Sequence, residues 1–484
     1  MNLGRLFRLA SVARHKNGHA VAPSGEVASA SLERKEIHFI GIGGIGMSGL
    51  ASILAERGLA IHGCDMKPTA TQRALLAQGI DVFIGHHPLH LTDDVGLVVY
   101  SSAVSEQEPE LLEARERGIR TISRGECLAD LASTRKLVAV AGAHGKTTTS
   151  GMAAQLLIHA GWDPTALVGG HVHSLGGNAR TGAGRYLVAE TDESDGSFLL
   201  LNPSIGIVTN IDREHLNHYQ TYENLIAAFR QFVRQLGPHG TLIRCEDDPI
   251  AREHLTHPHQ LSYGVHPQAD VQGIQVRACG WGSEFVASFR GQCLGNFRLR
   301  LPGYHNVLNA LAIISLGLVL DLPMVTVREA LALFRGTSRR FQMVELPNDV
   351  LFIDDYAHHP SEIRATLAAD PFTSRHRVVV FQPHRFSRTK LLEEEFARCF
   401  DRADGLIVTD IYAAFESPIP GVSGERVAKL IKEQGHPFVR YVPRPELTSY
   451  LSHMIQPQDT VFFLGAGDIG ELCHDLASVL SAPR

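Results

Sequence analysis

The sequence lacks three features that would each point to a particular class of protein. No apolar run approaches the roughly 18 residues of a membrane-spanning helix. The 7 cysteines are scattered, without the close spacing of a zinc site or the framework of a small disulfide-bonded domain. The net charge is only −6, so no general basic field exists to hold nucleic acid or an acidic membrane surface. We therefore expect no membrane span, no nucleic-acid partner, and reduced thiols in a cytoplasmic protein.

Length and composition indicate several packed domains. Hydrophobic residues make up 44% of the 484 residues and charged residues 20%, which is ordinary globular usage. A chain of this length predicts roughly three domains. Residues 1–34 contain scattered arginines but no apolar core of a secretory signal, so we predict a disordered leader. An organellar transit peptide has the same character and is the less favoured alternative.

The rest of the chain alternates short apolar runs with helical stretches, which predicts an α/β fold with parallel sheets. We expect a Rossmann-like N-terminal domain over 35–131, a P-loop central ATPase domain over 132–336 and a Rossmann-like C-terminal domain over 337–484. Short β-like runs between Cys245 and Leu301, including an expected strand over Phe297–Leu301, predict smaller β structure appended to the central domain.

A phosphate-binding loop is predicted between a strand over Lys136–Ala141 and the helix that follows it. Its sequence is Gly142-Ala-His-Gly-Lys-Thr-Thr-Thr149. Backbone N–H groups and a helix N-terminus at such a turn can surround a polyphosphate. Lys146 would reach the outer phosphates of ATP, and the Thr147 hydroxyl would bind Mg²⁺. Val140 stands where the usual loop has one more glycine, but the flanking elements favour nucleotide binding over a chance turn.

A second glycine turn, Gly41-Ile-Gly-Gly-Ile-Gly46, joins an expected strand over Glu36–Ile40 to a helix over Met47–Glu56. With Asp65 at the end of the next strand, the turn matches the dinucleotide fingerprint, which alone indicates NAD. Because ATP is already assigned to the second loop, we favour another diphosphate-bearing ligand, such as a UDP compound. A purely structural turn is the alternative.

Polar residues follow further expected strands. Glu190-Thr-Asp-Glu-Ser-Asp195 is suited to holding Mg²⁺ beside the phosphate loop, although a solvated acidic loop looks the same. His215 lies at the same sheet edge and is either a metal ligand or a surface histidine. Asn306 would contact adenine or cap its helix. Arg385 and Arg388 could bind a carboxylate or a phosphate, with surface charge as the alternative.

Four segments, occurring in order from about residue 35 to the end, resemble the Mur ligases of bacterial peptidoglycan synthesis. They are His38-Phe-Ile-Gly-Ile-Gly-Gly-Ile-Gly-Met-Ser-Gly49, the Gly-Lys-Thr-Thr-Thr loop, Asp354-Asp-Tyr-Ala-His-His-Pro360 and Pro383-His-Arg-Phe-Ser-Arg-Thr389. The resemblance is to the branch of the family that joins L-alanine to UDP-N-acetylmuramate. It implies ATP and Mg²⁺ as cofactors, small-molecule substrates, and a monomer or a homodimer.

The resemblance also implies a role for each matching residue. ATP would be bound by Gly142, Ala143, His144, Gly145, Lys146, Thr147, Thr148, Asn306 and Arg340. The UDP substrate would be bound by Gly43, Gly44, Ile45, Gly46, Met47, Asp65, Ser101 and Ser102. The amino acid would be bound by Tyr356, His384, Arg385 and Arg388. Metal ions would be held by Thr147, Glu190 and His215, and the catalytic residues would be Lys146, Glu190 and His215.

The chain departs from the family pattern at Ala143 and Cys64, where threonine and serine are usual. Neither change removes a charge, but both alter local hydrogen bonds. The implied reaction forms an acyl phosphate from the substrate carboxylate and ATP, which the alanine amine then attacks. Three alternatives stay open: a related ligase that recycles a whole tripeptide, an NAD-dependent oxidoreductase, and a non-catalytic nucleotide sensor.

Overall fold

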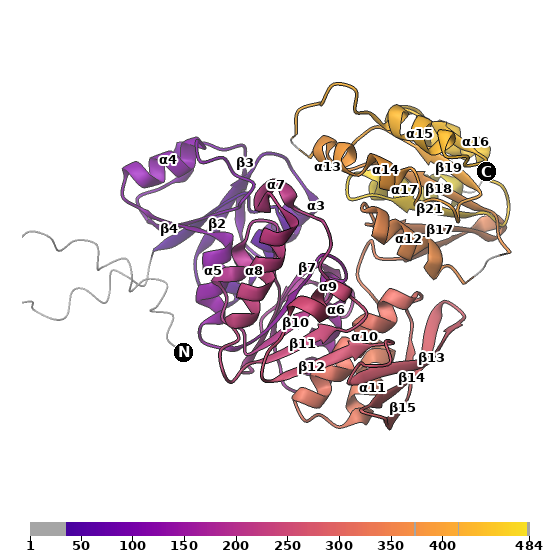
Figure 1. Ribbon diagram of the computed structural model, residues 1–484. Helices are drawn as coiled ribbons and strands as arrows, with labels where there is room; N and C mark the ends of the chain where they lie inside the picture. Colours follow the sequence, from indigo (N-terminus) through magenta and orange to yellow (C-terminus); the bar gives the residue numbers. More distant parts are fainter. Residues whose placement is uncertain (1–34, 372–373, 415, 482–484) are drawn as a thin grey trace, which may run out of the picture. The chain divides into compact units, whose positions relative to one another are not determined.

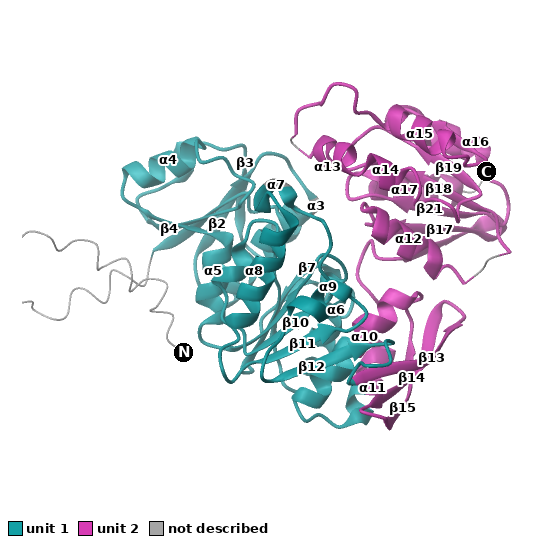
Figure 2. Cartoon of the chain, viewed as in Figure 1, with its two compact units in different colours: residues 1–270, 312–327 teal, residues 271–311, 328–484 magenta. Residues whose placement is uncertain are grey.

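The computed structural model describes residues 35–371, 374–414 and 416–481 (Figure 1). The predicted leader, residues 1–34, lies outside the described residues. The chain forms two compact units (Figure 2). Unit 1 contains the described residues up to Asp270 together with Ala312–Val327, and unit 2 contains Val271–Leu311 and the described residues from Arg328 onward. Helices α10 (Tyr304–Val319) and α11 (Met324–Leu333) contribute residues to both units.

The first sheet of unit 1 is parallel and has the strand order β3-β2-β1-β4-β5. Its strands are β1 (Glu36–Ile40), β2 (Ile61–Asp65), β3 (Asp81–Ile84), β4 (Val95–Tyr100) and β5 (Arg120–Ser123). Its helices are α2 (Ile45–Glu56), α3 (Ala70–Ala77), α4 (Pro109–Glu116) and α5 (Arg124–Ala132). The strand order reverses beside β1, and ligands of open α/β sheets bind at such a point.

The second sheet of unit 1 runs β12-β11-β10-β6-β9-β7-β8, with β8 antiparallel to β7. Its strands are β6 (Lys136–Ala141), β7 (Thr165–Val172), β8 (Gly177–Arg180), β9 (Tyr186–Glu190), β10 (Ile205–Val208), β11 (Thr241–Cys245) and β12 (Gln260–Gly264). Its helices are α6 (Lys146–His159), α7 (Leu216–Tyr219), α8 (Tyr222–Arg234) and α9 (Pro249–His254). Strand β6 lies between β9 and β10, so the carboxyl ends of three parallel strands meet around the loop that follows β6.

Unit 2 contains an antiparallel meander and a six-stranded sheet of order β16-β17-β21-β18-β19-β20. The meander consists of β13 (Val271–Cys279), β14 (Gly282–Phe289) and β15 (Gln292–Leu299). The sheet consists of β16 (Gln342–Leu346), β17 (Val350–Asp355), β18 (Arg377–Phe381), β19 (Gly405–Val408), β20 (Val439–Tyr441) and β21 (Thr460–Leu464). Its helices are α12 (Pro360–Ala369), α13 (Phe386–Leu391), α14 (Glu393–Phe396), α15 (Gly424–Glu433), α16 (Leu447–Met454) and α17 (Ile469–Ser481).

Two expected boundaries were wrong. The strand expected over Phe297–Leu301 overlaps β15 only at Phe297–Leu299, because β15 ends at Leu299 and begins earlier, at Gln292 directly opposite Phe289. Between them, Arg290 and Gly291 have φ of 49° and 84°, as in a two-residue hairpin turn of the primed type. Helix α2 begins two residues before the predicted Met47, at Ile45, because extended Gly44 is its N-cap.

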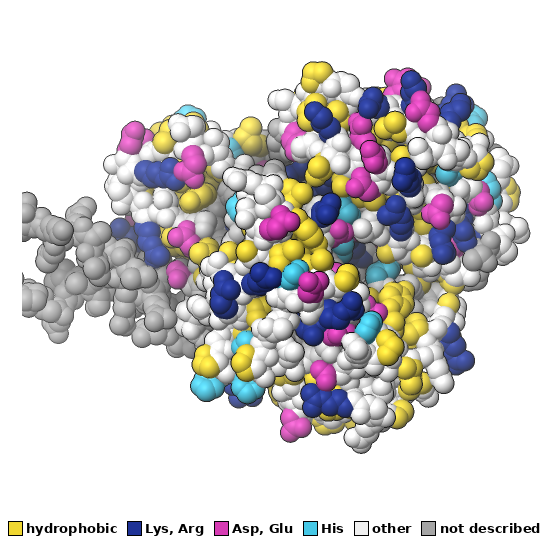
Figure 3. All heavy atoms as spheres, in the orientation of Figure 1, with side chains coloured by type: hydrophobic (Ala, Val, Ile, Leu, Met, Phe, Trp, Pro, Cys, Tyr) yellow, Lys and Arg dark blue, Asp and Glu magenta, His cyan; other side chains and the backbone are white. Residues whose placement is uncertain are grey.

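The described part of the chain contains no helix with both the length and the apolarity to cross a bilayer. On the face shown in Figure 3, Lys and Arg side chains lie among Asp and Glu side chains. This mixed surface agrees with the small net charge of −6.

Candidate active site

The loop after β6 has the backbone geometry of a phosphate cradle. Gly145, the N-cap of α6, has a left-handed φ of 82°, and Gly142 has a φ of 130°. A Cβ atom on Gly142 would lie 2.1 Å from the Thr209 hydroxyl oxygen at the end of β10. Only glycine satisfies both the conformation and the close approach. The predicted strand, loop and helix are confirmed, and Lys146 is the first residue of α6.

Lys146 is held by a carboxylate of the neighbouring strand end. Its Nζ lies 2.8 Å from Glu193 Oε1 and donates to the Gly142 carbonyl at 2.5 Å. Burial by itself lowers the pKa of Lys146, but the nearby Glu193 and Glu190 carboxylates outweigh it and raise the pKa above its ordinary value. The ammonium therefore stays charged at the mouth of the loop.

Thr147 and Glu190 lie together at the carboxyl ends of β6 and β9. The Thr147 hydroxyl donates to Glu190 Oε1 at 3.1 Å. The other oxygen of Glu190 accepts a hydrogen bond from the Gly169 backbone N–H at 2.6 Å, which fixes the carboxylate. Two of the three predicted metal-binding residues are thus neighbours, and their oxygen atoms are of the kind that Mg²⁺ prefers.

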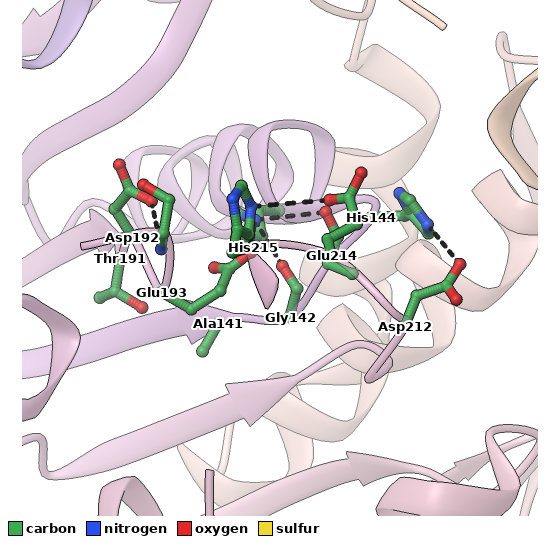
Figure 4. A network of polar contacts seen from close by, with 12 residues as sticks. Ala141, Gly142, His144, Thr191, Asp192, Glu193, Asp212, Glu214 and His215 are labelled. Carbon is green, nitrogen blue, oxygen red and sulfur yellow. Dashed lines mark hydrogen bonds and ion pairs between the residues drawn. The ribbon is translucent and has the colours of Figure 1, made fainter. Parts of the chain in front are cut away.

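The third, His215, lies among two further carboxylates (Figure 4). Its Nε2 is 3.7 Å from Glu193 Oε1 and 3.7 Å from Glu214 Oε2. These three side chains could hold a metal ion, because their ligand atoms all lie within 4.8 Å of one another. Burial raises the pKa of Glu193 to about 7. Among the described residues, its Oε2 atom is buried without a hydrogen-bond partner, as expected of an atom that a cation would complete.

The glycine turn after β1 is closed by Asp65 at the end of β2. The Gly43 backbone N–H donates to Asp65 Oδ2 at 2.8 Å, and the other oxygen accepts from the Met66 N–H at 2.8 Å. A Cβ on Gly43 would lie 2.7 Å from Asp65 Oδ2, so the turn requires glycine there. Asp65 therefore shapes the turn, and its predicted contact with a ribose stays a prediction.

The glycine turn and the phosphate loop open into one cavity of about 310 Å³ within unit 1. The lining combines predicted residues from both sites with an arginine and the acidic loop: Gly44, Ile45, Gly46, Met47, Ser101, Ser102, Arg124, Lys146, Leu167, Val168, Gly169, Glu190, Thr191 and Asp192. Two basic side chains, Lys146 and Arg124, thus face the same space.

Arg124 was not predicted as a site residue, and neither Glu193 nor Glu214 was given an individual role. Arg124 is the first residue of α5, directly after β5, and its NH2 group lies 3.2 Å from Asp192 and 3.3 Å from Asp195. Its place after a parallel strand was the available signal, because such strand ends meet at one sheet edge.

In unit 2, the residues predicted to bind the amino acid form a connected group after β17 and β18. The Tyr356 ring is 5.4 Å from the His358 ring, which is 5.6 Å from the His384 ring. Arg388 NH1 lies 3.1 Å from His384 Nδ1, and Arg385 is the N-cap of α13 with a φ of 66°. Burial, His358 and nearby arginines lower the pKa of His384 to about 3. The imidazole is therefore neutral.

The two remaining residues predicted to bind ATP also belong to unit 2. Asn306 is buried and donates to the Pro302 carbonyl at 2.7 Å, so its amide secures the start of α10. The Arg340 guanidinium lies 5.1 Å from the centre of the Tyr356 ring and 3.5 Å from Glu362. Their predicted contacts with ATP stay predictions.

Comparison with known proteins gives consistent matches along the chain. Three family models match: Mur ligase family, catalytic domain, over residues 36–136; Mur ligase middle domain over 140–317; and Mur ligase, glutamate ligase domain, over 339–467. A UDP-N-acetylmuramate–L-alanine ligase of Sorangium cellulosum is 47% identical over 463 residues, covering 93% of this chain and 97% of the relative.

Two solved structures extend the comparison. The UDP-N-acetylmuramate-alanine ligase MurC of Thermotoga maritima is 30% identical with a TM-score of 0.80, and the match covers 92% of this chain and 98% of that one. A murein peptide ligase of Psychrobacter arcticus has a TM-score of 0.69 at 22% identity, covering 93% and 99%. At that identity, the second likeness concerns the fold alone.

Proposed function

This chain belongs to the Mur ligase family, and from that membership we propose that it joins the carboxylate of UDP-N-acetylmuramate to the amine of L-alanine. The reaction would convert ATP to ADP and phosphate and supply a peptidoglycan precursor. The 47% identity to an L-alanine ligase over almost the whole chain supports this choice of substrates.

The shared cavity is the observation that carries the proposal. A ligase of this type must bring the carboxylate of one substrate to the γ-phosphate of another. In unit 1, the glycine turn at Gly44–Met47 and Lys146 of the phosphate loop line the same cavity. A UDP sugar bound at the turn and ATP bound at the loop would direct their reacting groups into this one space.

In the first step, the carboxylate oxygen attacks the γ-phosphorus, the bond to the β-phosphate oxygen breaks, and ADP leaves. Two anions must approach, so the main task of the protein is to offset their repulsion and orient them. Lys146 and Arg124 are the cationic side chains that line the cavity, and Lys146 would bind the transferring phosphate.

The donor atoms in this region fit a hard cation. The Thr147 hydroxyl and Glu190 form one oxygen pair, and Glu193, Glu214 and His215 form a second group. We therefore propose that these residues hold Mg²⁺. When bound, Mg²⁺ would neutralise phosphate charge.

In the second step, the alanine amine attacks the acyl carbon and phosphate leaves. We propose that the group around Tyr356, His384 and Arg388 in unit 2 binds the amino acid. Arg388 offers a planar donor pair for the alanine carboxylate. His384 is neutral and can accept a hydrogen bond, because its pKa is about 3.

The proposal includes a cytoplasmic location, which the seven free cysteines support, because thiols stay reduced there. The domain roles follow the predicted boundaries: 35–131 for the UDP substrate, 132–336 for ATP and 337–484 for the amino acid. Either a monomer or a homodimer would allow this function, since the shared cavity is formed within unit 1 of one chain.

The rival activities are separated by substrate. The experiment measures phosphate release with ATP, Mg²⁺ and UDP-N-acetylmuramate while the amino acid or peptide is varied. We expect release that requires both UDP-N-acetylmuramate and L-alanine. Release with the tripeptide L-alanyl-γ-D-glutamyl-meso-diaminopimelate, and none with L-alanine, would instead assign the recycling ligase. If no acceptor gives phosphate release, the remaining candidate functions are a nucleotide sensor and an oxidoreductase.

A further inference from the structure

A cluster of metal-ligating side chains lies in the first sheet of unit 1, separate from the proposed catalytic residues. His38 is on β1, Cys64 is on β2, His86 follows β3 and Glu110 is in the first turn of α4. The His38 and Glu110 side chains are fully buried, and that of His86 is 11% exposed. Buried polar groups of this kind usually share either a hydrogen-bond network or a metal ion.

Three of the distances between ligand atoms in this cluster are close to those of a tetrahedral zinc site. Cys64 Sγ lies 3.6 Å from His38 Nε2, 3.0 Å from His86 Nδ1 and 2.7 Å from Glu110 Oε2. Glu110 Oε2 lies 3.7 Å from His38 Nε2 and 3.4 Å from His86 Nδ1. In a tetrahedron with Zn bond lengths of about 2.0–2.3 Å, neighbouring ligand atoms are about 3.3–3.6 Å apart.

The ligand atoms of His38, Cys64 and Glu110 therefore all lie within 4.8 Å of one another, and His86 Nδ1 lies beside Cys64 and Glu110. The two shortest distances belong to the thiol, which donates a hydrogen bond to Glu110. These two edges would lengthen by roughly 0.3–0.9 Å once a cation replaced the thiol proton.

A second layer of contacts fixes the ligands. Glu110 Oε1, the oxygen outside the cluster, accepts from the His87 backbone N–H at 3.0 Å and lies 2.5 Å from His90 Nδ1. The other ring nitrogen of His38 lies 3.2 Å from His62 Nδ1. Outer partners of this sort orient the carboxylate and imidazole ligands of metal sites.

From this geometry we propose that His38, Cys64, His86 and Glu110 bind one structural Zn²⁺ ion. One thiolate, two imidazoles and one carboxylate suit Zn²⁺, whereas Mg²⁺ prefers oxygen ligands and a soft thiolate is a poor ligand for it. On binding, the S–H bond of Cys64 breaks, an S–Zn bond forms and the proton passes to solvent, with no change in oxidation state. The partly exposed His86 gives the ion a path from the surface.

A metal ion bound at this site would stabilise the glycine turn that follows β1. Cys64 precedes Asp65, whose carboxylate holds the Gly43 N–H. A bound ion would link β1, β2, the segment after β3 and α4 at this point. The serine that is usual at position 64 in the family lacks the thiolate, so the site would be a property of chains that carry cysteine here.

The test is metal binding by the full-length protein and three variants. Purified protein is incubated with one equivalent of Zn²⁺ in excess Mg²⁺, desalted and analysed for bound zinc, and Tm is measured with and without Zn²⁺. Cys64→Ser removes the thiolate. Cys127→Ser is the matched control, because Cys127 is also buried in unit 1 but is not part of the cluster. His215→Ala removes a ligand of the proposed catalytic metal group.

We expect about one zinc per chain in the wild type, the Cys127→Ser variant and the His215→Ala variant, and a rise in their Tm with Zn²⁺. Cys64→Ser should lose at least about tenfold in zinc affinity. Substitution of Co²⁺ should give the wild type, but not Cys64→Ser, the absorption of a tetrahedral cobalt–thiolate complex. Because this spectrum is measured on the wild type, it tests for thiolate coordination even if the Cys64→Ser variant folds poorly.

The proposal is overturned if the wild type retains no zinc, if Cys64→Ser binds zinc as tightly as the wild type, or if zinc is lost in His215→Ala instead. Failure of the zinc site leaves the proposed ligase function intact, because phosphate release is measured separately.

Discussion

At the scale of single residues, the account depends most on Lys146. Its ammonium lies beside Glu193 and lines the cavity shared with the glycine turn. We expect Lys146→Ala to fold normally and to lower kcat about 10²–10³-fold or more, because a charge directed at the transferring phosphate is lost. Phosphate-release kinetics would measure this. Lys429→Ala, which changes a 77% exposed side chain in unit 2, is the control. Near-normal turnover in Lys146→Ala would contradict the phosphate-loop assignment.

Arg388 is the second residue for which we make a specific prediction. It is half-buried and contacts His384, whereas Arg385 is exposed. Arg388→Lys should lower kcat/KM for L-alanine about tenfold or more and leave KM for ATP unchanged, because an ammonium cannot replace a planar donor pair. The exposed pair of Arg426 with Glu393 offers the control, Arg426→Lys. If Arg388→Lys has the wild-type kcat/KM for L-alanine, Arg388 does not bind the amino acid and is only a surface charge.

His384 predicts a pH dependence. Its pKa falls from 6.5 to about 3 in the folded protein, first because it is buried and then because His358 and Arg388 are near. Between these two values, the unfolded chain binds the proton more readily. The stability that the neutral ring contributes is therefore complete above pH 6.5 and is lost as the pH falls toward 3.

NMR titration of labelled histidines would measure this pKa, with the His384→Asn spectrum providing the assignment. We expect the His384 resonance to keep its neutral position from pH 8 to about pH 4. A midpoint near that of an exposed histidine would show that the ring is solvated.

At the scale of elements, the packing of α2 on the second sheet places the glycine turn beside the phosphate loop. Asn178 of β8 donates to the Ile45 carbonyl at 2.5 Å, and a Cβ on Gly49 would lie 2.3 Å from Leu167 Cδ1 of β7. The helix therefore approaches these strands with no side chain of its own at Gly49.

Gly49→Ala should force α2 away from β7, lower Tm and raise KM for UDP-N-acetylmuramate, since overpacking of this kind costs about 1–3 kcal/mol. Thermal unfolding and steady-state kinetics would measure both effects. Gly177→Ala on β8 is the matched control, because a Cβ there meets only ordinary contacts at 3.9 Å. Equal behaviour of the two variants would show that close packing at Gly49 does not position the turn.

Elements whose signal is local were predictable from the sequence. Strand β6 and its loop follow from an apolar run ending in glycines, and β1 and β6 have the predicted bounds. The start of β15 depends on the Arg290–Gly291 turn, which was not predicted from the sequence. Contacts among Cys64 on β2, His86 after β3 and Glu110 on α4 depend on how separate elements pack together, so hydrophobic periodicity does not predict them.

In the candidate site too, some residues were predictable from local sequence and others only from the three-dimensional structure. Thr147 was predicted from the Gly-Lys-Thr loop and Glu190 from an acidic run at a strand end, because parallel strand ends meet at one sheet edge. That same rule could have identified Arg124, but a single arginine after a strand carries no motif. The carboxylates Glu193 and Glu214 lay within segments already singled out, yet only the three-dimensional distances separate them from their neighbours.

At the scale of the whole molecule, the chain combines a glycine turn and a phosphate loop in unit 1 with a cationic and aromatic group in unit 2. Each is common in other proteins, and their combination favours a ligase over an oxidoreductase or a sensor. The central claim is that the substrate carboxylate itself accepts the γ-phosphate.

Oxygen-isotope transfer tests that claim most directly. UDP-N-acetylmuramate labelled with ¹⁸O in both carboxylate oxygens is incubated with ATP, Mg²⁺ and L-alanine, and the phosphate and the amide product are analysed by mass spectrometry. The account predicts that one labelled oxygen leaves in the phosphate and the other stays in the amide carbonyl. Unlabelled phosphate formed along with the amide would contradict an acyl-phosphate intermediate.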